Sequence, residues 1–206
     1  MKNIRILLID DHAVMRMGLA SLLQTCSELS VVGDCGDCQS ALGAVSRFPI
    51  DVAIVDLMMP GVDGVETTRR ILKARPELKV LILTTFGSSD GISHALEAGA
   101  SGAILKSAGL EELRTAIRTV ALGKRYISDE IEQILSDDPP LPELSPRQRE
   151  ILTCLTRGLE NSDIARILGI SKPMVNEHIA RILEKLDVAN RTEAVALCLR
   201  KHLLNI

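Results

Sequence analysis

The stretch Val52-Ala53-Ile54-Val55-Asp56-Leu57-Met58-Met59-Pro60-Gly61 runs from four apolar residues through an aspartate into a turn. A short apolar run bounded by polar and turn residues is typical of a strand that is buried on both faces. Segments with the apolar spacing of amphipathic helices lie between this run and four similar ones. The alternation predicts an α/β fold, with a five-stranded, doubly wound parallel sheet. The four other predicted strands are residues 4–9, 29–32, 80–83 and 103–105.

Polar side chains follow the apolar runs of four predicted strands. Asp10 and Asp11 follow the first strand, while Asp56, Thr84 and Lys106 follow the third, fourth and fifth. In an open parallel sheet the ligand site lies beyond the carboxyl ends of the strands, at a switch point in strand order. We therefore expect three carboxylates, a hydroxyl and an ammonium group to converge at one edge of the sheet.

These five groups suit phosphoryl chemistry. Crowded carboxylates repel one another unless a cation joins them, and Mg²⁺ is a hard divalent ion that prefers oxygen ligands. A carboxylate can also attack phosphorus to form an acyl phosphate. Mg²⁺ and Lys106 would balance the charge of the transferring group, and Thr84 would donate a hydrogen bond to it. A single aspartate at a strand end is more simply a solvated loop residue, but five groups at four strand ends favour a site.

The composition changes after residue 123. Residues 124–143 contain Asp137-Asp138 and three prolines, which predicts a semi-extended linker. From residue 144 onward the pattern is one of short helices with clear start signals. Two of them flank Gly169-Ile170-Ser171, which predicts a helix-turn-helix within a small all-α domain at 144–206. The expected N-caps of the four helices are Ser145, Asn161, Ser171 and Asn190.

The first part of the chain resembles the receiver domain of two-component response regulators, which is flavodoxin-like. The matching residues are Asp10-Asp11, the stretch 56–64, Thr84 and Lys106, and the resemblance covers residues 1–123. It implies that Asp56 accepts a phosphoryl group from a sensor histidine kinase, while Thr84 and Lys106 contact the phosphoryl oxygens. It also implies a Mg²⁺ site formed by Asp10, Asp11, Asp56 and the backbone carbonyl of Met58.

One position departs from the receiver pattern. The family usually carries Tyr or Phe shortly before the lysine, as a ring that turns inward when the threonine moves. Ala103 occupies the equivalent position here. We expect the phosphorylation chemistry to survive this change and the conformational coupling to differ, with Phe86 as a candidate replacement for the ring.

The second part is similar to the LuxR-type helix-turn-helix, so the whole chain resembles NarL/FixJ-family regulators. The matching residues include 144–152, Asn161 and 168–171. The resemblance implies binding of double-stranded DNA, and a homodimer on two half-sites is the expectation. Where the family commonly has Thr-Val-Lys at the start of the recognition helix, this chain has Met174-Val175-Asn176. The candidate DNA-contact residues are Lys172, Arg181 and Lys185 for phosphates, Asn176 for adenine, and Glu177 for a cytosine amino group.

The leading hypothesis is a two-component transcription regulator, which is not an enzyme. Net charge is −5 over residues 1–140 and +2 over 141–206, as expected if only the second part meets a polyanion. The alternative is a phospho-receiver that acts mainly through protein contacts, with a weakened DNA-binding domain. A phosphohydrolase is disfavoured because Met58 stands where such enzymes need a second carboxylate.

The remaining sequence features concern the compartment. No apolar run is long enough to span a bilayer, and the N-terminal sequence contains no signal-peptide core, which predicts a cytoplasmic protein without membrane contact. Five cysteines are consistent with reduced thiols. Cys35 and Cys38 form a C-x-x-C, for which a redox pair or half of a zinc site is the alternative to two small residues after a strand.

Overall fold

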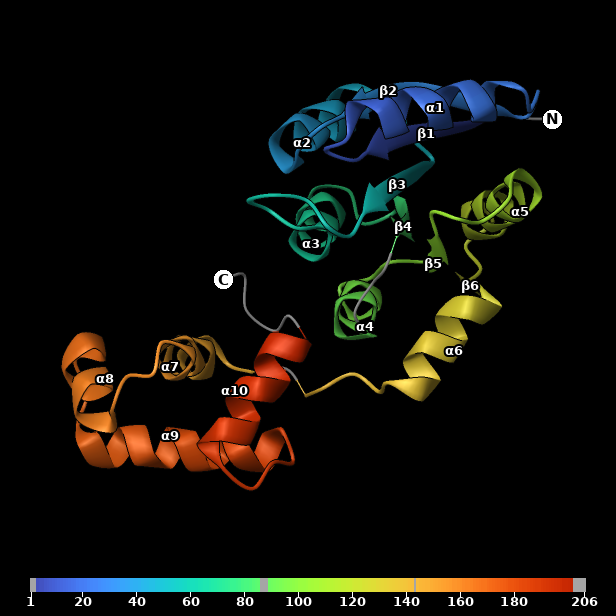
Figure 1. Ribbon diagram of the computed structural model, residues 1–206. Coiled ribbons are helices and arrows are strands. Elements are labelled where there is room, and N and C mark those ends of the chain that lie inside the picture. Colours follow the sequence, from blue (N-terminus) through green and yellow to red (C-terminus); the bar gives the residue numbers. More distant parts are fainter. Residues whose placement is uncertain (1–2, 86–88, 143, 202–206) are drawn as a thin grey trace. The chain divides into compact units, whose positions relative to one another are not determined.

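The computed structural model describes residues 3–85, 89–142 and 144–201 (Figure 1). The chain divides into two compact units, Met1–Pro139 and Pro140–Ile206. Each unit has its own hydrophobic core and is described by itself. Within the described residues, no helix is long and apolar enough to cross a membrane.

The first unit is built on a parallel sheet of six strands in the order β2-β1-β3-β4-β5-β6 (Figure 1). From β1 the chain adds β2 on one side of the sheet, and then β3 and the later strands on the other side. This reversal of direction places the switch point of a doubly wound sheet between β1 and β3. The predicted α/β class and parallel sheet are thus confirmed. The strands are β1 Ile4–Ile9, β2 Leu29–Cys35, β3 Val52–Asp56, β4 Lys79–Thr84, β5 Gly102–Leu105 and β6 Tyr126–Ile127.

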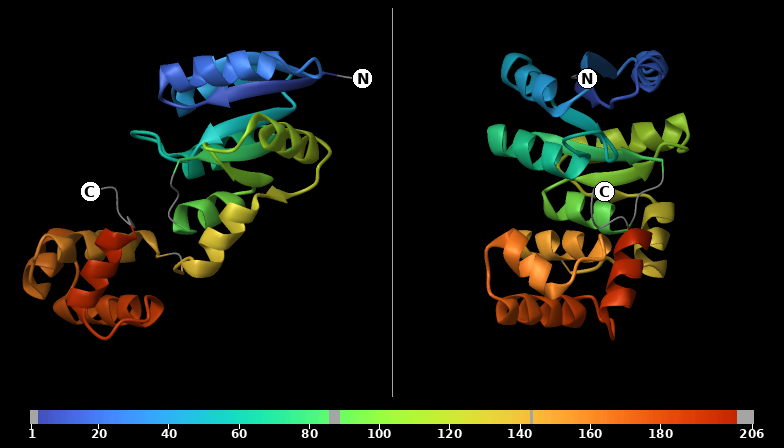
Figure 2. Two further views of the ribbon diagram at one scale, coloured as in Figure 1. Left: turned by 45° about the vertical axis from the view of Figure 1, so that its right-hand side comes forward. Right: turned by 60° about the vertical axis from the view of Figure 1, so that its left-hand side comes forward.

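Helices cover both faces of this sheet (Figure 2). Because side chains alternate along a strand, Leu7 and Ile9 enter one core while Ile6 and Leu8 enter the other. Helices α2, α3, α4 and α6 pack on the first face, and α1 and α5 pack on the second. Their bounds are α1 Ala13–Gln24, α2 Cys38–Arg47, α3 Gly64–Ala74, α4 Ser89–Glu97, α5 Leu110–Ala121 and α6 Asp129–Asp137.

The segment after α5 differs from the sequence prediction. The predicted sheet of five strands lacks β6, which pairs with Gly102 and Ala103 of β5. The predicted linker 124–143 is wrong over much of its length, because it contains β6 and α6. Ile131 of α6 is fully buried against the sheet, so this helix belongs to the first core. The proline-containing segment that follows α6 has no regular secondary structure over its described residues.

The second unit contains four helices around a core of aliphatic residues and cysteines. Gly169, with φ of +64°, ends α8 in the left-handed conformation and makes the turn into α9. The caps at Ser145, Ser171 and Asn190 are confirmed, with a capping box at Ser145. The cap predicted at Asn161 is wrong, since this residue begins α8 and Glu160 precedes it at the N-cap. The helices are α7 Pro146–Thr156, α8 Asn161–Leu168, α9 Lys172–Lys185 and α10 Arg191–Arg200.

Candidate functional site

A pair of buried ion pairs joins three strand ends of the first unit. Asp10 directly follows β1, Asp56 ends β3, and Lys106 directly follows β5. The Nζ atom of Lys106 lies 2.6 Å from Oδ2 of Asp10 and 3.0 Å from Oδ2 of Asp56. All three side chains are less than 10% exposed, at 9%, 3% and 6% for Asp10, Asp56 and Lys106. The topology therefore brings these sequence-predicted residues together at the carboxyl edge of the sheet.

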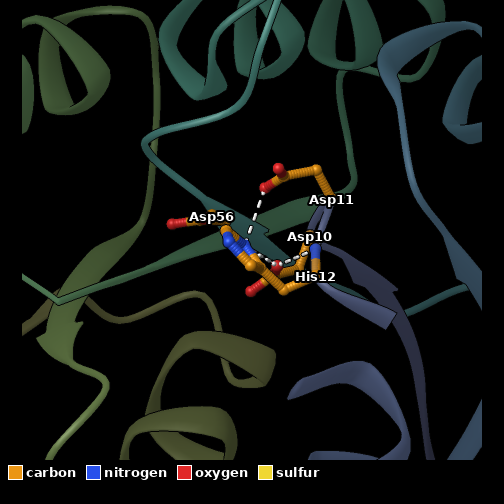
Figure 3. Close-up of side chains that lie close together, drawn as sticks. All are labelled: Asp10, Asp11, His12 and Asp56. Atoms are coloured by element: carbon orange, nitrogen blue, oxygen red, sulfur yellow. Dashed lines mark hydrogen bonds and ion pairs between the residues drawn. The ribbon is translucent and has the colours of Figure 1, made fainter. Parts of the chain in front are cut away.

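Asp11 and His12 complete a compact group of possible metal ligands (Figure 3). Ligand atoms of Asp10, Asp11, His12 and Asp56 all lie within 4.8 Å of one another, and these four residues are called the acidic cluster below. The Nδ1 atom of His12 is 3.0 Å from Oδ1 of Asp11 and 3.3 Å from Oδ1 of Asp10. The sequence reasoning missed His12, although its place directly after the aspartate pair was a usable signal.

The acidic cluster fits a divalent cation. Oδ1 of Asp11 is buried and accepts no hydrogen bond of regular geometry in the described parts of the chain, although Nδ1 of His12 lies 3.0 Å from it. A buried carboxylate oxygen without a regular hydrogen bond, beside two further carboxylates, is a position that a hard cation would satisfy. Met58 lies two residues after Asp56, and its backbone N–H donates a 3.3 Å hydrogen bond to Oδ1 of Asp56. The donor set is thus mainly oxygen, with one imidazole at its rim.

Burial and neighbouring charges shift the pKa values of the two central groups. Burial, helped by the charge of Asp10, raises the pKa of Asp56 above the usual value, against the opposing effect of Lys106. Burial lowers the pKa of Lys106, but hydrogen bonds from its ammonium group to Asp10 and Asp56 outweigh that effect and raise it. Lys106 therefore stays charged at neutral pH, at a place where negative charge accumulates.

Thr84, at the end of β4, is fully buried, and its Oγ1 atom has no hydrogen-bond partner within the described parts of the chain. A buried hydroxyl without a partner costs free energy, so a polar group that reached it would be bound favourably. Ala103 is fully buried in β5, and Phe86, the candidate replacement for the missing ring, lies outside the described residues. The structure thus leaves Thr84 available as a hydrogen-bond donor beside the strand ends.

A glycine fixes the loop that follows Asp56. A Cβ atom built on Gly64 would lie 2.2 Å from the backbone oxygen of Asp56 and 2.7 Å from Cα of Leu57. The backbone N–H of Gly64 donates to the carbonyl of Leu57 at 2.9 Å. The start of α3 is therefore pressed against the end of β3, which only glycine allows. This contact holds the loop that carries Met58 in place.

The exposed face of α9 carries all five candidate DNA-contact residues of the second unit, which are Lys172, Asn176, Glu177, Arg181 and Lys185. Two of them form an ion pair, with Nη2 of Arg181 2.6 Å from Oε1 of Glu177. Asn176 accepts a 2.7 Å hydrogen bond from the amide of Asn161 in α8, a contact that the sequence did not reveal. The five cysteines are free and buried, including Cys35 and Cys38.

Comparison with known proteins gives the same division of the chain. The model of the response regulator receiver domain matches residues 6–118, and that of the luxR family of bacterial regulatory proteins matches residues 142–198. The transcriptional regulatory protein LiaR of Bacillus subtilis is 35% identical, covering 98% of this chain and 100% of its own length. The response regulator protein VraR of Staphylococcus aureus is 33% identical, covering 98% and 99%.

Solved structures agree with these relatives. The response regulator ChrA of a heme-sensing two-component system has a TM-score of 0.58 at 37% identity, covering 99% of this chain and 100% of its own. A complex of the two-component response regulator RcsB with DNA has a TM-score of 0.68 at 25% identity, covering 97% and 99%.

An acidic cluster at the edge of a doubly wound sheet, followed by a helix-turn-helix, defines a signal receiver joined to a DNA-binding domain. The chain belongs to the two-component response regulators of the NarL/LuxR type. It is a transcription regulator with a receiver domain and a LuxR-type DNA-binding domain.

Proposed function

We propose that Asp56 is the phosphoacceptor of this regulator and that a sensor histidine kinase is the phosphoryl donor. An oxygen of Asp56 attacks phosphorus, so a P–O bond forms as the P–N bond to the donor histidine breaks, and the released imidazole takes up a proton. The observation that carries this proposal is the contact of Asp56 with Lys106, 3.0 Å from Nζ to Oδ2 in a buried pocket. Asp10 and Lys106 hold the carboxylate at the strand end, where a donor can approach.

Lys106 and Thr84 are the groups proposed to bind the transferred phosphoryl. Lys106 contributes fixed positive charge, because its ammonium group is held by two carboxylates. Phosphorylation of Asp56 places the negative charge on the phosphoryl oxygens instead of the carboxylate. The ammonium group of Lys106 can then bind these oxygens. Thr84 contributes a hydroxyl that has no other partner among the described residues. Both groups stabilise negative charge without needing a change of protonation.

Mg²⁺ is the proposed cofactor of the acidic cluster. Asp10, Asp11, Asp56 and the backbone carbonyl of Met58 are the proposed ligands, and the close approach of the three carboxylates, one of which has a buried oxygen without a regular hydrogen bond, supports this choice. When bound, the ion supplies positive charge that lowers the repulsion between the carboxylates and the incoming phosphoryl group. His12, at the rim, keeps its imidazole against Asp10 and Asp11 and contributes to orienting both carboxylates.

The DNA contacts are proposed to lie on α9. The N-terminal half of a recognition helix reads base edges in the major groove. Asn176 and Glu177 therefore read bases, while Lys172, Arg181 and Lys185 neutralise phosphates. The RcsB–DNA complex supports double-stranded DNA as the partner, and two half-sites bound by a homodimer follow from two-fold symmetry. A cytoplasmic location stays a prediction.

Labelling with acetyl phosphate tests the phosphoacceptor. The native chain should be labelled in the presence of Mg²⁺ and should not be labelled when EDTA is added before acetyl phosphate. Asp56→Asn should not be labelled under either condition. DNA affinity should rise with labelling in the native chain and not in Asp56→Asn. Asp51→Asn is the matched control, since Asp51 pairs with Arg5 at the opposite end of β3. Equal labelling of Asp56→Asn and the native chain would refute the proposal.

A further inference from the structure

The amide of Asn176 is held by a second amide from the neighbouring helix. Asn161 Nδ2 donates a 2.7 Å hydrogen bond to Oδ1 of Asn176, across 15 residues of sequence. Asn161 lies in the first turn of α8 and is partly buried, and its own Oδ1 atom is buried without a hydrogen-bond partner among the described residues. Asn176 lies one turn into α9 and is exposed. Because burial restricts the Asn161 side chain more than the exposed Asn176 side chain, we assign to Asn161 the role of orienting Asn176 through their shared hydrogen bond.

This contact decides which end of the Asn176 amide faces outward. A free asparagine can present either its oxygen, which accepts, or its NH₂ group, which donates. Because Oδ1 of Asn176 is turned toward Asn161, its Nδ2 atom is directed away from α8. That Nδ2 atom makes no hydrogen bond to any part of the chain that the structure describes. The helix thus presents a donor at this position.

The residue next to Asn176 on α9 already has a charged partner. Glu177, the adjacent residue, forms an ion pair with Arg181 along the outside of the helix, 2.6 Å from Oε1 to Nη2. In this turn of α9, the Asn176 amide is therefore the uncharged group whose N–H bonds point outward without a partner among the described residues. In the major groove a donor matches N7 and O6 of guanine and O4 of thymine, whereas it opposes the N4 amino group of cytosine and meets both an acceptor and a donor on adenine.

We propose that Asn161 is a positioning residue for base recognition, which fixes Asn176 as a donor that selects a keto base, guanine or thymine, over cytosine at one position of each half-site. This inference rests on the proposed DNA interface of α9. It differs from the sequence interpretation in two respects. Asn161 becomes part of the specificity of the protein without touching DNA, and the NH₂ group of Asn176, not the whole amide edge, makes the selection.

The Asn161→Asp substitution tests the orientation directly. Aspartate has nearly the same shape but only accepts hydrogen bonds, so Asn176 must turn its NH₂ group inward and its oxygen outward. An outward oxygen accepts from the N4 amino group of cytosine or the N6 amino group of adenine. A negative charge in the first turn also suits the dipole of α8, so the fold should persist. Ser162→Asp is the matched control, because it places the same charge on the next, exposed residue of α8.

The experiment is selection from a randomised double-stranded DNA pool by the phosphorylated full-length chain. The native chain and Ser162→Asp should enrich guanine or thymine at one position, and Asn161→Asp should replace it with cytosine or adenine, a swing of roughly tenfold in relative affinity. Asn176→Ala should lose the preference at that position alone. Unfolding curves of all variants check the fold.

Two results would overturn the inference. If Asn161→Asp or Asn176→Ala selects the same base as the native chain at every position, Asn161 does not set the readout, while the DNA interface stands. If the native chain enriches no sequence, both the inference and the proposed interface fail. Reversal of one base preference by Asn161→Asp, absent in Ser162→Asp, is an outcome that a purely structural role of Asn161 does not produce.

Discussion

The ammonium group of Lys106 lies 3.0 Å from the carboxylate of Asp56, and both side chains are almost completely buried. A second carboxylate, that of Asp10, lies 2.6 Å from the same nitrogen. The pocket therefore contains two negative charges for one positive charge, before Asp11 is counted. Each charge in such a place costs desolvation energy, which the geometry of the ion pairs only partly offsets. A cation added to this site would therefore stabilise the folded protein.

The Lys106→Met substitution should expose this imbalance. It leaves Asp10 and Asp56 buried without a counter-charge, and removal of one partner of a buried ion pair costs about 3–5 kcal/mol. We expect urea unfolding at pH 7 to show a loss at the lower end of that range. Millimolar Mg²⁺ should recover more stability in the variant than in the native chain. Equal responses of the two proteins to Mg²⁺ would contradict this account of the acidic cluster.

The Gly64→Ala substitution should destabilise the receiver domain and slow phosphorylation. The new Cβ atom would meet the backbone of Asp56 at 2.2 Å, so the loop after β3 must shift, at a cost of about 1–3 kcal/mol. Gly43→Ala is the control, because nothing lies within 4 Å of a Cβ atom there. Gly43 is inside α2, where alanine should stabilise by roughly 0.5–1 kcal/mol. Thermal unfolding should therefore move in opposite directions in the two variants.

The cap of α2 should make stability depend on pH in the acid range. Asp37 accepts a hydrogen bond from the Ser40 backbone N–H, and that bond lowers the pKa of Asp37 below its usual value. A lowered pKa in the folded state means that the stabilisation is complete above the unfolded pKa and is lost as the pH falls through the folded one.

Asp37→Ala should therefore cost about 1 kcal/mol at pH 7, and the difference from the native chain should shrink below roughly pH 4. Asp37→Asn is the matched control, since asparagine caps a helix about as well but does not ionise. Urea unfolding at pH 3 and pH 7 measures both effects. An Asp37→Ala difference that is the same at the two pH values would show that ionisation of the cap is irrelevant.

The Ile131→Ala substitution should show that α6 belongs to the receiver core. Ile131 is fully buried in the core of the first unit, so its truncation should cost about 2–5 kcal/mol. Glu132→Ala, on the exposed side of the same helix, should change stability little. Unfolding of the full chain, followed by far-ultraviolet circular dichroism, measures both. If Ile131→Ala left the free energy of unfolding almost unchanged, α6 would not belong to the receiver core, and the linker predicted for residues 124–143 would stand.

Much of the receiver fold could be read from the sequence, because its strands are nearly continuous apolar runs. The bounds predicted for the first strand, residues 4–9, are those of β1. The rule that ligands bind at the carboxyl ends of parallel strands predicted from the sequence alone that Asp10, Asp56 and Lys106 lie at one edge of the sheet. These inferences depend on short-range patterns that the sheet topology then preserves.

The missed elements depend on tertiary contacts. A two-residue strand such as β6 has no periodicity to detect, and its pairing with β5 stabilises it. In α6 the apolar residues Ile131, Ile134 and Leu135 have helical spacing, but the acidic residues and the following prolines dominated the interpretation. The Asn161–Asn176 contact joins two helices through side chains, which no local pattern encodes.

The ion pair between Glu177 and Arg181 should weaken the electrostatic part of DNA binding. It holds the guanidinium group of Arg181 along α9, 2.6 Å from the carboxylate, and therefore away from a phosphate. Glu177→Gln should release Arg181 for a phosphate contact and remove a repulsive charge. Each added phosphate contact steepens the dependence of log K on log salt by about 0.9 units.

We therefore expect Glu177→Gln to bind DNA more tightly at low salt and to have a slope steeper by roughly one unit per bound half-site. Glu150→Gln is the control, because Glu150 forms a similar pair with Arg147 at 2.7 Å in α7, outside the helix-turn-helix pair α8 and α9. Fluorescence anisotropy from 50 to 300 mM salt measures both slopes, with the concentrations chosen as approximate bounds of the screening range. Parallel lines for the native chain and Glu177→Gln would mean that Arg181 reaches its phosphate despite the pair, or reaches none in either protein. Because Arg181→Ala should flatten the slope only in the first case, that variant separates the two.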